Sequence, residues 1–143
     1  MIWQKIKSLL FSERPGILNG RCVLLIDDGQ VERHAVKRML EKQGCRVVTA
    51  ENGHIGLHLA ETEKPDLILL DFFMPGMLGT EVCERLKDNG FTKNIPIIFL
   101  TGSDAPANIV NCYDVGAAQF LAKPVDAKTL VSQVKHVLNE PNL

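Results

Sequence analysis

The stretch Leu67-Ile68-Leu69-Leu70-Asp71-Phe72-Phe73-Met74-Pro75 decides the fold, because four aliphatic residues run directly into an aspartate. Turn signals stand on both sides, Pro65-Asp66 before the stretch and Pro75-Gly76 at its end. An apolar run bounded in this way predicts a strand buried on both faces of a sheet. Asp71 then stands at the carboxyl end of that strand, the edge where open α/β sheets bind ligands. The alternative is an aspartate that only caps the next turn.

The size and composition of the chain predict one globular domain. Its 143 residues suffice for a core, and 45% apolar with 23% charged residues is ordinary for a globular protein. A net charge of −1 gives no reason to expect a nucleic-acid surface. The four cysteines form no Cys-x-x-Cys pair, so we expect reduced thiols and a cytoplasmic location. No apolar run reaches the ~20 residues of a membrane span.

Residues 1–20 differ in character from the rest and predict a short amphipathic helix followed by a linker. Lysines interrupt the apolar residues and a Ser-Glu-Arg-Pro-Gly segment follows, which does not fit a secretory signal. Three roles fit such a helix: packing on the domain, pairing with another chain, or membrane contact through residues 1–11. A loosely held terminus is the simplest alternative. The apolar residues at helical spacing are Ile2, Trp3, Ile6, Leu9, Leu10 and Phe11.

Beyond residue 20 the chain alternates between strand-like and helical patterns, which places one domain over residues 21–143. Such alternation predicts an α/β fold with a parallel sheet, right-handed crossovers and helices on both faces. Val31 and Ile55 belong to the apolar positions of the first two helices. Strands are predicted over residues 22–26, 46–50, 67–71, 95–101 and 119–122. Helices are predicted over residues 30–43, 52–63, 79–88, 106–114 and 126–138.

A parallel sheet gathers the carboxyl ends of its strands at one edge, here together with polar side chains. Three carboxylates at close range repel one another unless a cation joins them, and an all-oxygen set favours Mg²⁺. With a metal present, a strand-end aspartate can attack phosphorus to give an aspartyl phosphate, whose charge a lysine helps to neutralise. The polar residues at this edge are Asp27, Asp28, Asp71, Thr101 and Lys123.

Residues 21–138 resemble the receiver domain of two-component response regulators, the CheY-like domain. The intervals from Asp71 to Thr101 and from Thr101 to Lys123 are 30 and 22 residues. The resemblance implies a flavodoxin-like, doubly wound fold with five parallel strands in the order 2-1-3-4-5 and five helices. The features that carry it are Asp27-Asp28, Asp71 in D-F-F-M-P-G-M-L-G, Thr101, Phe120 and Lys123-Pro124, for which a cis peptide bond is one expectation.

The resemblance also implies a role for each residue of the site. Asp71 matches the phosphoacceptor, phosphorylated by a histidine kinase or a histidine phosphotransfer protein. Asp28 and Asp71 match direct Mg²⁺ ligands, and Asp27 matches a position that acts through metal-bound water. The main-chain carbonyl of Phe73 matches the remaining protein ligand.

The switch residues follow from the same resemblance. Thr101 matches the residue that closes on the phosphoryl group, and Lys123 matches its ion-pair partner. Phe120 matches an aromatic side chain that turns inward as the threonine moves. Phosphorylation then biases a two-state equilibrium. The expected output surface lies within residues 106–138, with Asn108 and Tyr113 as candidates.

The expected protein is a single-domain response regulator with no output domain. It is expected to be a monomer or a dimer. Its expected partners are a kinase or phosphotransfer protein and a downstream protein. It is not expected to be an enzyme beyond Mg²⁺-dependent self-phosphotransfer and slow hydrolysis. Phe73 stands where a polar residue is frequent in the family. We hypothesise that it shields the acyl phosphate from water, against the alternative that it merely packs over the edge of the site.

Two other functions remain as alternatives. One is a degenerate receiver that serves only as a protein-interaction module, against which the complete acidic, Thr and Lys set argues. The other is a phosphatase of the haloacid-dehalogenase type, which needs a second aspartate where this chain has Phe73. His54 and His58 are spaced for a metal on one helix, but no third ligand accompanies them, and a solvated face is the preferred interpretation.

Overall fold

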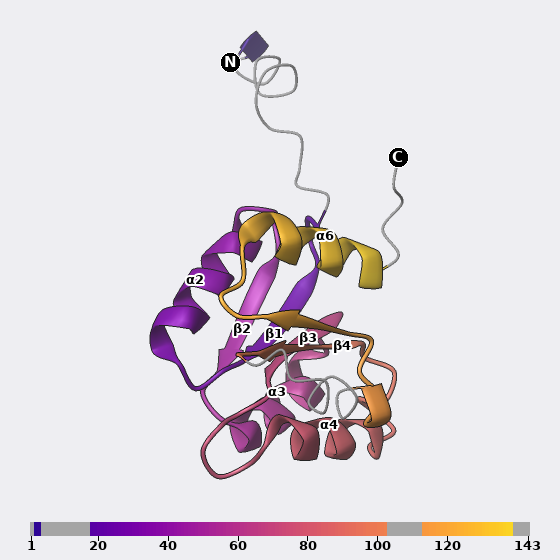
Figure 1. Cartoon of the computed structure of the whole chain (residues 1–143). Helices are drawn as coiled ribbons and strands as arrows, with labels where there is room; N and C mark the ends of the chain where they lie inside the picture. The colour runs from indigo at the N-terminus through magenta and orange to yellow at the C-terminus, as the bar shows by residue number, and fades with distance from the viewer. Residues whose placement is uncertain (1, 4–17, 103–112, 139–143) are drawn as a thin grey trace.

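Five parallel strands form the central sheet in the order β2-β1-β3-β4-β5 (Figure 1). The computed structural model describes residues 2–3, 18–102 and 113–138. The predicted doubly wound, flavodoxin-like architecture is confirmed. The strands are β1 (Cys22–Ile26), β2 (Arg46–Ala50), β3 (Leu67–Asp71), β4 (Ile97–Thr101) and β5 (Gln119–Ala122).

Helices pack on both faces of the sheet, as the strand–helix alternation predicts (Figure 1). Alternate residues of each strand point to opposite faces, so the fully buried β3 supplies both cores. Leu69 packs with Leu40 and Val134 on one face, and Ile68 packs with Val82 on the other. The first face is covered by α2 (Gln30–Glu41) and α6 (Ala127–Val137), and the second by α3 (Gly53–Glu63) and α4 (Gly79–Lys87).

The element boundaries follow local chemistry. Asn52 caps α3 by accepting a hydrogen bond from the Ile55 amide at 2.9 Å, and Asp126 caps α6 in the same way. The prediction had counted both caps as helical. The fourth strand begins at Ile97, two residues later than predicted, because Pro96 has no amide hydrogen to donate. The predicted helix over 106–114 lies mostly outside the described residues.

Two apolar residues that were counted in the apolar patterns of their helices are exposed. Ile55 is 39% exposed because α3 turns Gly56 toward the sheet, where a Cβ atom would collide with the side chain of Ile26. Val31 is 78% exposed. It lies five residues before the buried Val36, which is ~140° around the helix. In both helices the sequence pattern included an exposed apolar residue because the apolar face is narrower than the pattern suggested.

The segment that precedes the sheet enters the domain beside the turn between α2 and β2. Leu18 is fully buried in the same core as Leu40. The amide of Gly20 donates to the Gly44 carbonyl at 3.2 Å. Ile2 and Trp3 are helical and exposed, whereas the rest of the predicted amphipathic helix lies outside the described residues. No helix in the described ranges is long and apolar enough to cross a membrane.

Val134 and Val31 both lie in helices, but only Val134 is fully buried. Replacing each valine by alanine therefore distinguishes the effect of burial on stability from the effect of helix propensity. Val134→Ala is expected to lower the free energy of unfolding by about 2 kcal/mol through lost packing. Val31→Ala is expected to change it by less than ~0.5 kcal/mol. Urea titration of both variants measures the difference, and equal losses would contradict the burial assignment.

Candidate functional site

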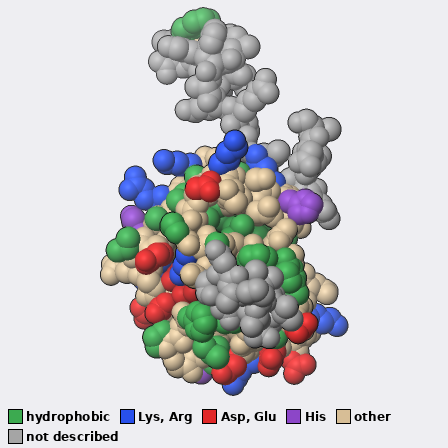
Figure 2. Space-filling model, viewed as in Figure 1, with side chains coloured by type: hydrophobic (Ala, Val, Ile, Leu, Met, Phe, Trp, Pro, Cys, Tyr) green, Lys and Arg blue, Asp and Glu red, His purple; other side chains and the backbone are tan. Residues whose placement is uncertain are grey.

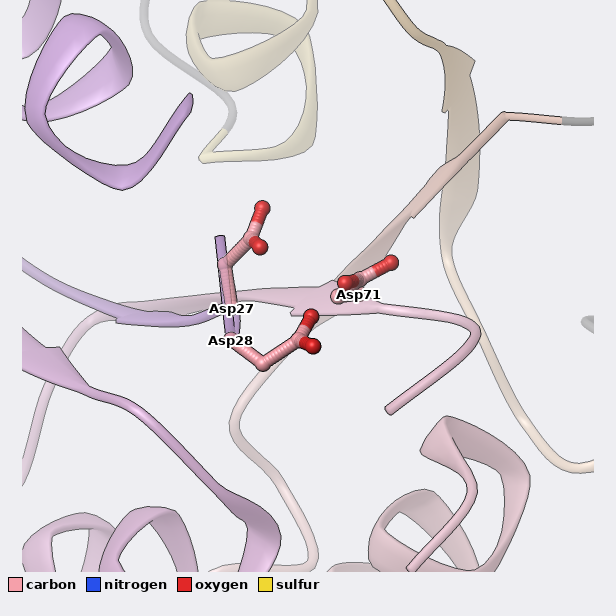
Figure 3. Close-up of side chains that lie close together, drawn as sticks. All are labelled: Asp27, Asp28 and Asp71. Carbon is pink, nitrogen blue, oxygen red and sulfur yellow. The ribbon is translucent and has the colours of Figure 1, made fainter. Parts of the chain in front are cut away.

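Three carboxylates meet at the carboxyl edge of the sheet (Figure 3). Asp27 and Asp28 follow β1, and Asp71 ends the neighbouring strand β3. One carboxylate oxygen from each residue lies within 4.8 Å of the others. Asp27 and Asp71 are buried, while Asp28 is exposed to solvent. The predicted gathering of these side chains is therefore observed, with one of the three open to an incoming ligand.

Lys123 is the cation of this cluster. Its ammonium lies 3.0 Å from Asp27 Oδ2 and 3.3 Å from Asp71 Oδ1. The amide of Lys123 donates to the Thr101 carbonyl at 2.8 Å, which fixes the loop after β5 on the end of β4. The Lys123-Pro124 peptide bond is cis. These contacts make Lys123 part of the acidic cluster and not a solvated surface lysine.

Backbone and side-chain donors hold Asp27 in place. The Gly29 amide donates to Asp27 Oδ1 at 2.8 Å, and Arg33 Nη1 donates to the Asp27 carbonyl at 2.7 Å. The amide of Asp27 donates to the carbonyl of Ala50 in β2 at 3.0 Å. Arg33 was missed at the sequence level, because an isolated arginine on a polar helix face resembles any solvated residue.

The backbone around Asp71 is equally constrained. The amide of Phe72 donates to the Leu100 carbonyl at 2.9 Å, and the amide of Gly79 donates to the Phe72 carbonyl at 2.9 Å. Gly79 must lack a side chain, because a Cβ atom there would collide with the Asp71 carbonyl. Phe73 is 54% exposed, and its ring contacts Phe72 edge to face at 4.7 Å. The loop thus carries a partly exposed apolar ring two residues after Asp71.

The electrostatics of the cluster favour a proton or another cation on Asp71. Burial, the charge of Asp27 and a hydrogen bond with Asp28 raise the pKa of Asp71 to about 7, although Lys123 opposes the shift. Burial alone would lower the pKa of Lys123. Its hydrogen bond to Asp27 and the charge of Asp71 outweigh burial, and the pKa of Lys123 rises. The ammonium therefore stays charged while the carboxylates remain in excess.

The donor set fits a hard divalent cation. All three side chains offer oxygen, and three carboxylates against one ammonium leave an excess of negative charge when ionised. Mg²⁺ is commonly bound by one or two carboxylates with water completing its coordination. The exposed Asp28 and the raised pKa of Asp71 mark the side of the cluster where positive charge is lacking.

The two predicted switch residues lie on neighbouring strands. Thr101 ends β4 and is fully buried, and it pairs in register with Ala122 of β5. Phe120 is half-buried and packs against the core between the sheet and α3–α4. The ring of Tyr113 contacts the Phe120 ring edge to face at 6.0 Å. Tyr113 was a candidate for the output surface, and the structure places it against the predicted switch side chain.

Other residues that the sequence singled out lie away from this edge. His54 and His58 are exposed on α3, as the solvated-face interpretation predicts. Cys45 and Cys83 are buried and Cys22 is half-buried, and the Cys83 thiol donates to the Val115 carbonyl at 3.2 Å. Asn108 and Cys112 lie outside the described residues.

Comparison with known proteins agrees with this geometry. The family model of the response regulator receiver domain matches residues 23–135. Protein PilH of Pseudomonas aeruginosa is 40% identical over 116 residues, covering 81% of this chain and 96% of PilH. The structure of the chemotaxis protein CheY4 of Vibrio cholerae has a TM-score of 0.79 at 32% identity, covering 82% of this chain and 98% of that one.

A further solved structure contains a metal. It is the receiver domain of a sensor histidine kinase from Pseudomonas aeruginosa, described with magnesium coordinated in its active-site cleft. Its TM-score is 0.79 at 27% identity, and the match covers 84% of this chain and 98% of that chain.

The raised pKa of Asp71 predicts a pH-dependent effect of Asp71→Asn on stability in EDTA. The folded pKa of about 7 exceeds the unfolded value. The stability that the folded protein gains from holding Asp71 protonated is therefore fully present below about pH 4. It is lost as the pH rises through about 7 and the carboxyl ionises in the folded state. Asp71→Asn should raise the free energy of unfolding on the order of 2 kcal/mol at about pH 8 and by much less at about pH 5.

Urea titration at the two pH values tests this expectation. Glu81→Gln is the matched control, because Glu81 is an exposed carboxylate in α4. It should leave the unfolding free energy nearly unchanged at both pH values. If Asp71→Asn raised the unfolding free energy equally at both pH values, or at neither, charge repulsion at Asp71 would not explain its effect.

Proposed function

We propose that this chain, which belongs to the response regulator receiver domain family, is a phosphorylation switch whose phosphoryl group is carried by Asp71. The observation that carries the proposal is the place of this carboxylate. It ends the central strand β3, beside Asp27 and Asp28 and 3.3 Å from the ammonium of Lys123. We assign the receiver domain to residues 21–143 and a separate extension to residues 1–20.

The proposed reaction is phosphoryl transfer from a phosphohistidine of a histidine kinase or histidine phosphotransfer protein. An oxygen of the ionised Asp71 attacks phosphorus, and the phosphorus–nitrogen bond of the donor breaks. The donor imidazole keeps the electron pair and takes up a proton, and the product is an acyl phosphate. Lys123 favours the ionised form of Asp71 and lies where it can neutralise charge on the phosphoryl oxygens. We place this exchange in the cytoplasm, where thiols stay reduced.

Asp28, Asp71 and the main-chain carbonyl of Phe73 would hold Mg²⁺, with Asp27 acting through water. When bound, the ion supplies positive charge that offsets the charge of the phosphoryl oxygens. The protein's part is to hold these oxygens in place through the Gly29 amide and the backbone pairing of β1 and β3. Slow hydrolysis of the acyl phosphate by water, which releases phosphate and restores the Asp71 carboxylate, would return the switch to its resting state.

The signal is proposed to leave through β4 and β5. Thr101 moves toward the new phosphoryl group, and the Phe120 ring turns into the space that it leaves. This motion would separate the Phe120 ring from Tyr113, which is 45% exposed and so accessible to a partner. The output surface then lies within residues 106–138, of which residues 113–138 are described.

A small phosphodonor with Mg²⁺ tests the function directly. The chain is expected to form a covalent adduct with one phosphoryl group per chain, and Asp71→Asn should abolish it. Intact mass spectrometry detects the adduct, with Asp88→Asn as an exposed control at the end of α4 that should leave it intact. Continuous release of phosphate would instead favour the phosphatase, and no adduct in the presence of Mg²⁺ would favour the inert module.

The exposed ring of Phe73 predicts how long that adduct lasts. Phe73→Asn is expected to shorten the half-life of the acyl phosphate several-fold, because an amide in place of the ring admits and orients water near Asp71. Phe73→Leu should stay close to the wild type, since it keeps an apolar cover. Time courses of the adduct measure both half-lives. If the asparagine variant decays no faster than the wild type, Phe73 only packs over the edge of the site.

A further inference from the structure

The turn between α4 and β4 holds one phenylalanine ring in solvent. Phe91 is 87% exposed, the largest fraction of any large apolar side chain among the described residues, whereas the next residue, Thr92, is buried. The ring therefore adds little to the core. A single exposed ring is ordinary on a folded domain. Two features set Phe91 apart: a fixed turn beneath it and a groove beside it.

Backbone and side-chain hydrogen bonds fix the turn that carries Phe91. The Phe91 amide donates to Asn89 Oδ1 at 2.9 Å, and the Thr92 amide donates to the Asn89 carbonyl at 3.0 Å. The Thr92 hydroxyl donates to the Leu86 carbonyl at 2.7 Å, and the Ile95 amide donates to the Thr92 carbonyl at 3.0 Å. Because the turn is already ordered, burying its ring against a partner costs little backbone entropy.

A groove of about 200 Å³ opens beside this turn, between α3 and α4. Leu86, which is buried, and Leu57, which is half-buried, give it an apolar base. Asn89 and Thr92 also line it, and they flank Phe91 in the sequence. The ring and the groove therefore belong to one continuous surface, and the exposure of the ring shows that it does not fill its own groove. The remaining lining residues are His58, Glu61 and Arg85.

The polar walls of the groove leave a cation available to an aromatic ring. Glu61, on α3, accepts a hydrogen bond from the side-chain amide of Asn89. Arg85, on α4, forms no ion pair with any residue that the structure describes. A guanidinium attracts the negative face of an aromatic ring. With its apolar base and this cation, the groove is complementary to a phenyl ring.

The charge around the groove does not suit an anionic partner. Helices α3 and α4 carry four glutamates against Arg85 and Lys87. Figure 2 shows hydrophobic side chains among charged ones over the lower part of the domain, where α3 and α4 lie in Figure 1. An apolar contact at this face should therefore persist at high salt, because salt screens repulsion between acidic groups.

We propose that two copies of this chain associate through this face, with the Phe91 ring of each chain in the α3–α4 groove of the other. A two-fold contact uses the same surface on both chains, so the inserted group and the receiving groove must lie together on one chain. The turn over residues 89–92 meets this condition, because it presents the ring and also lines the groove.

The size of the contact predicts a weak dimer. Two buried rings remove on the order of 300–500 Å² of their own surface from water. A stable permanent dimer usually needs a total interface well above ~1,200 Å². The expected association is therefore reversible and depends on protein concentration. It does not depend on phosphorylation of Asp71.

Sedimentation equilibrium of the full chain between about 10 and 500 µM measures this association. The mean mass is expected to rise with concentration from that of one chain toward that of two. The rise in ~0.5 M salt should be at least as large as the rise in ~0.1 M salt.

Substitutions in the ring and in the groove test the two halves of the contact. Phe91→Ser is expected to weaken association by roughly tenfold or more, because each dimer loses two buried rings. Val31→Ser is its control, since Val31 is 78% exposed on α2, across the sheet, and this variant should associate like the wild type. Arg85→Glu should weaken association several-fold, because a carboxylate repels the face of the ring, whereas Lys128→Glu on α6 should not. Urea titration should show that Phe91→Ser folds as stably as the wild type.

An isotope-filtered nuclear Overhauser experiment locates the contact. Unlabelled chain is mixed with chain that is deuterated and ¹³C-labelled at its leucine methyl groups, so that only contacts between two chains give a signal. The expected signals join the Phe91 ring protons of one chain to the methyl groups of Leu57 and Leu86 of the other.

Three results would overturn the proposal. They are a chain that sediments as a single copy at every concentration, a Phe91→Ser variant that associates as strongly as the wild type, and a dimer without ring-to-methyl signals between its chains. Asp71→Asn should associate like the wild type, so failure of the phosphorylation switch and failure of the dimer are separately visible.

Discussion

Repulsion among three carboxylates is the constraint on which the rest of the site depends. Parallel pairing of β1 and β3 sets Ile26 beside Leu70, so Asp27, which follows β1, and Asp71, which ends β3, must lie side by side. Burial of Asp27 and Asp71 then removes most of the water that would screen their charges. A single ammonium offsets part of the repulsion, and the hydrogen bond between the Lys123 amide and the Thr101 carbonyl holds the loop that carries it on the end of β4.

The same constraint makes the site responsive to charge. Lys123 and Phe120 are only three residues apart and straddle the end of β5, an edge strand with β4 as its single neighbour in the sheet. In the proposed switch, the ammonium that faces the charge and the aromatic ring that moves are therefore carried by one short strand and the residue that follows it. Thr101 ends the neighbouring strand and pairs with Ala122, so both proposed switch residues share one backbone ladder.

Sequence patterns were sufficient to find all five strands, including the edge strands β2 and β5, which are mostly half-buried or exposed. The central strands read as continuous apolar runs because both faces of a doubly wound sheet are covered, and the aspartates at the strand ends followed from the topology. The patterns failed where a contact depends on a neighbour in space. Ile55 points outward because Gly56 fits against Ile26, and the contact of Arg33 with the Asp27 carbonyl needs the geometry of the α2 entrance. Neither is visible in a linear sequence.

The architecture ties the acidic cluster to two helices that cover the same face of the sheet. α2 begins directly after Gly29, whose amide holds Asp27, and α6 begins soon after Lys123. Both helices pack on the sheet through buried side chains such as Leu40 and Val134. The packing of these helices therefore fixes the two loops that bring Asp27 and Lys123 together, while Asp28 stays exposed beside them.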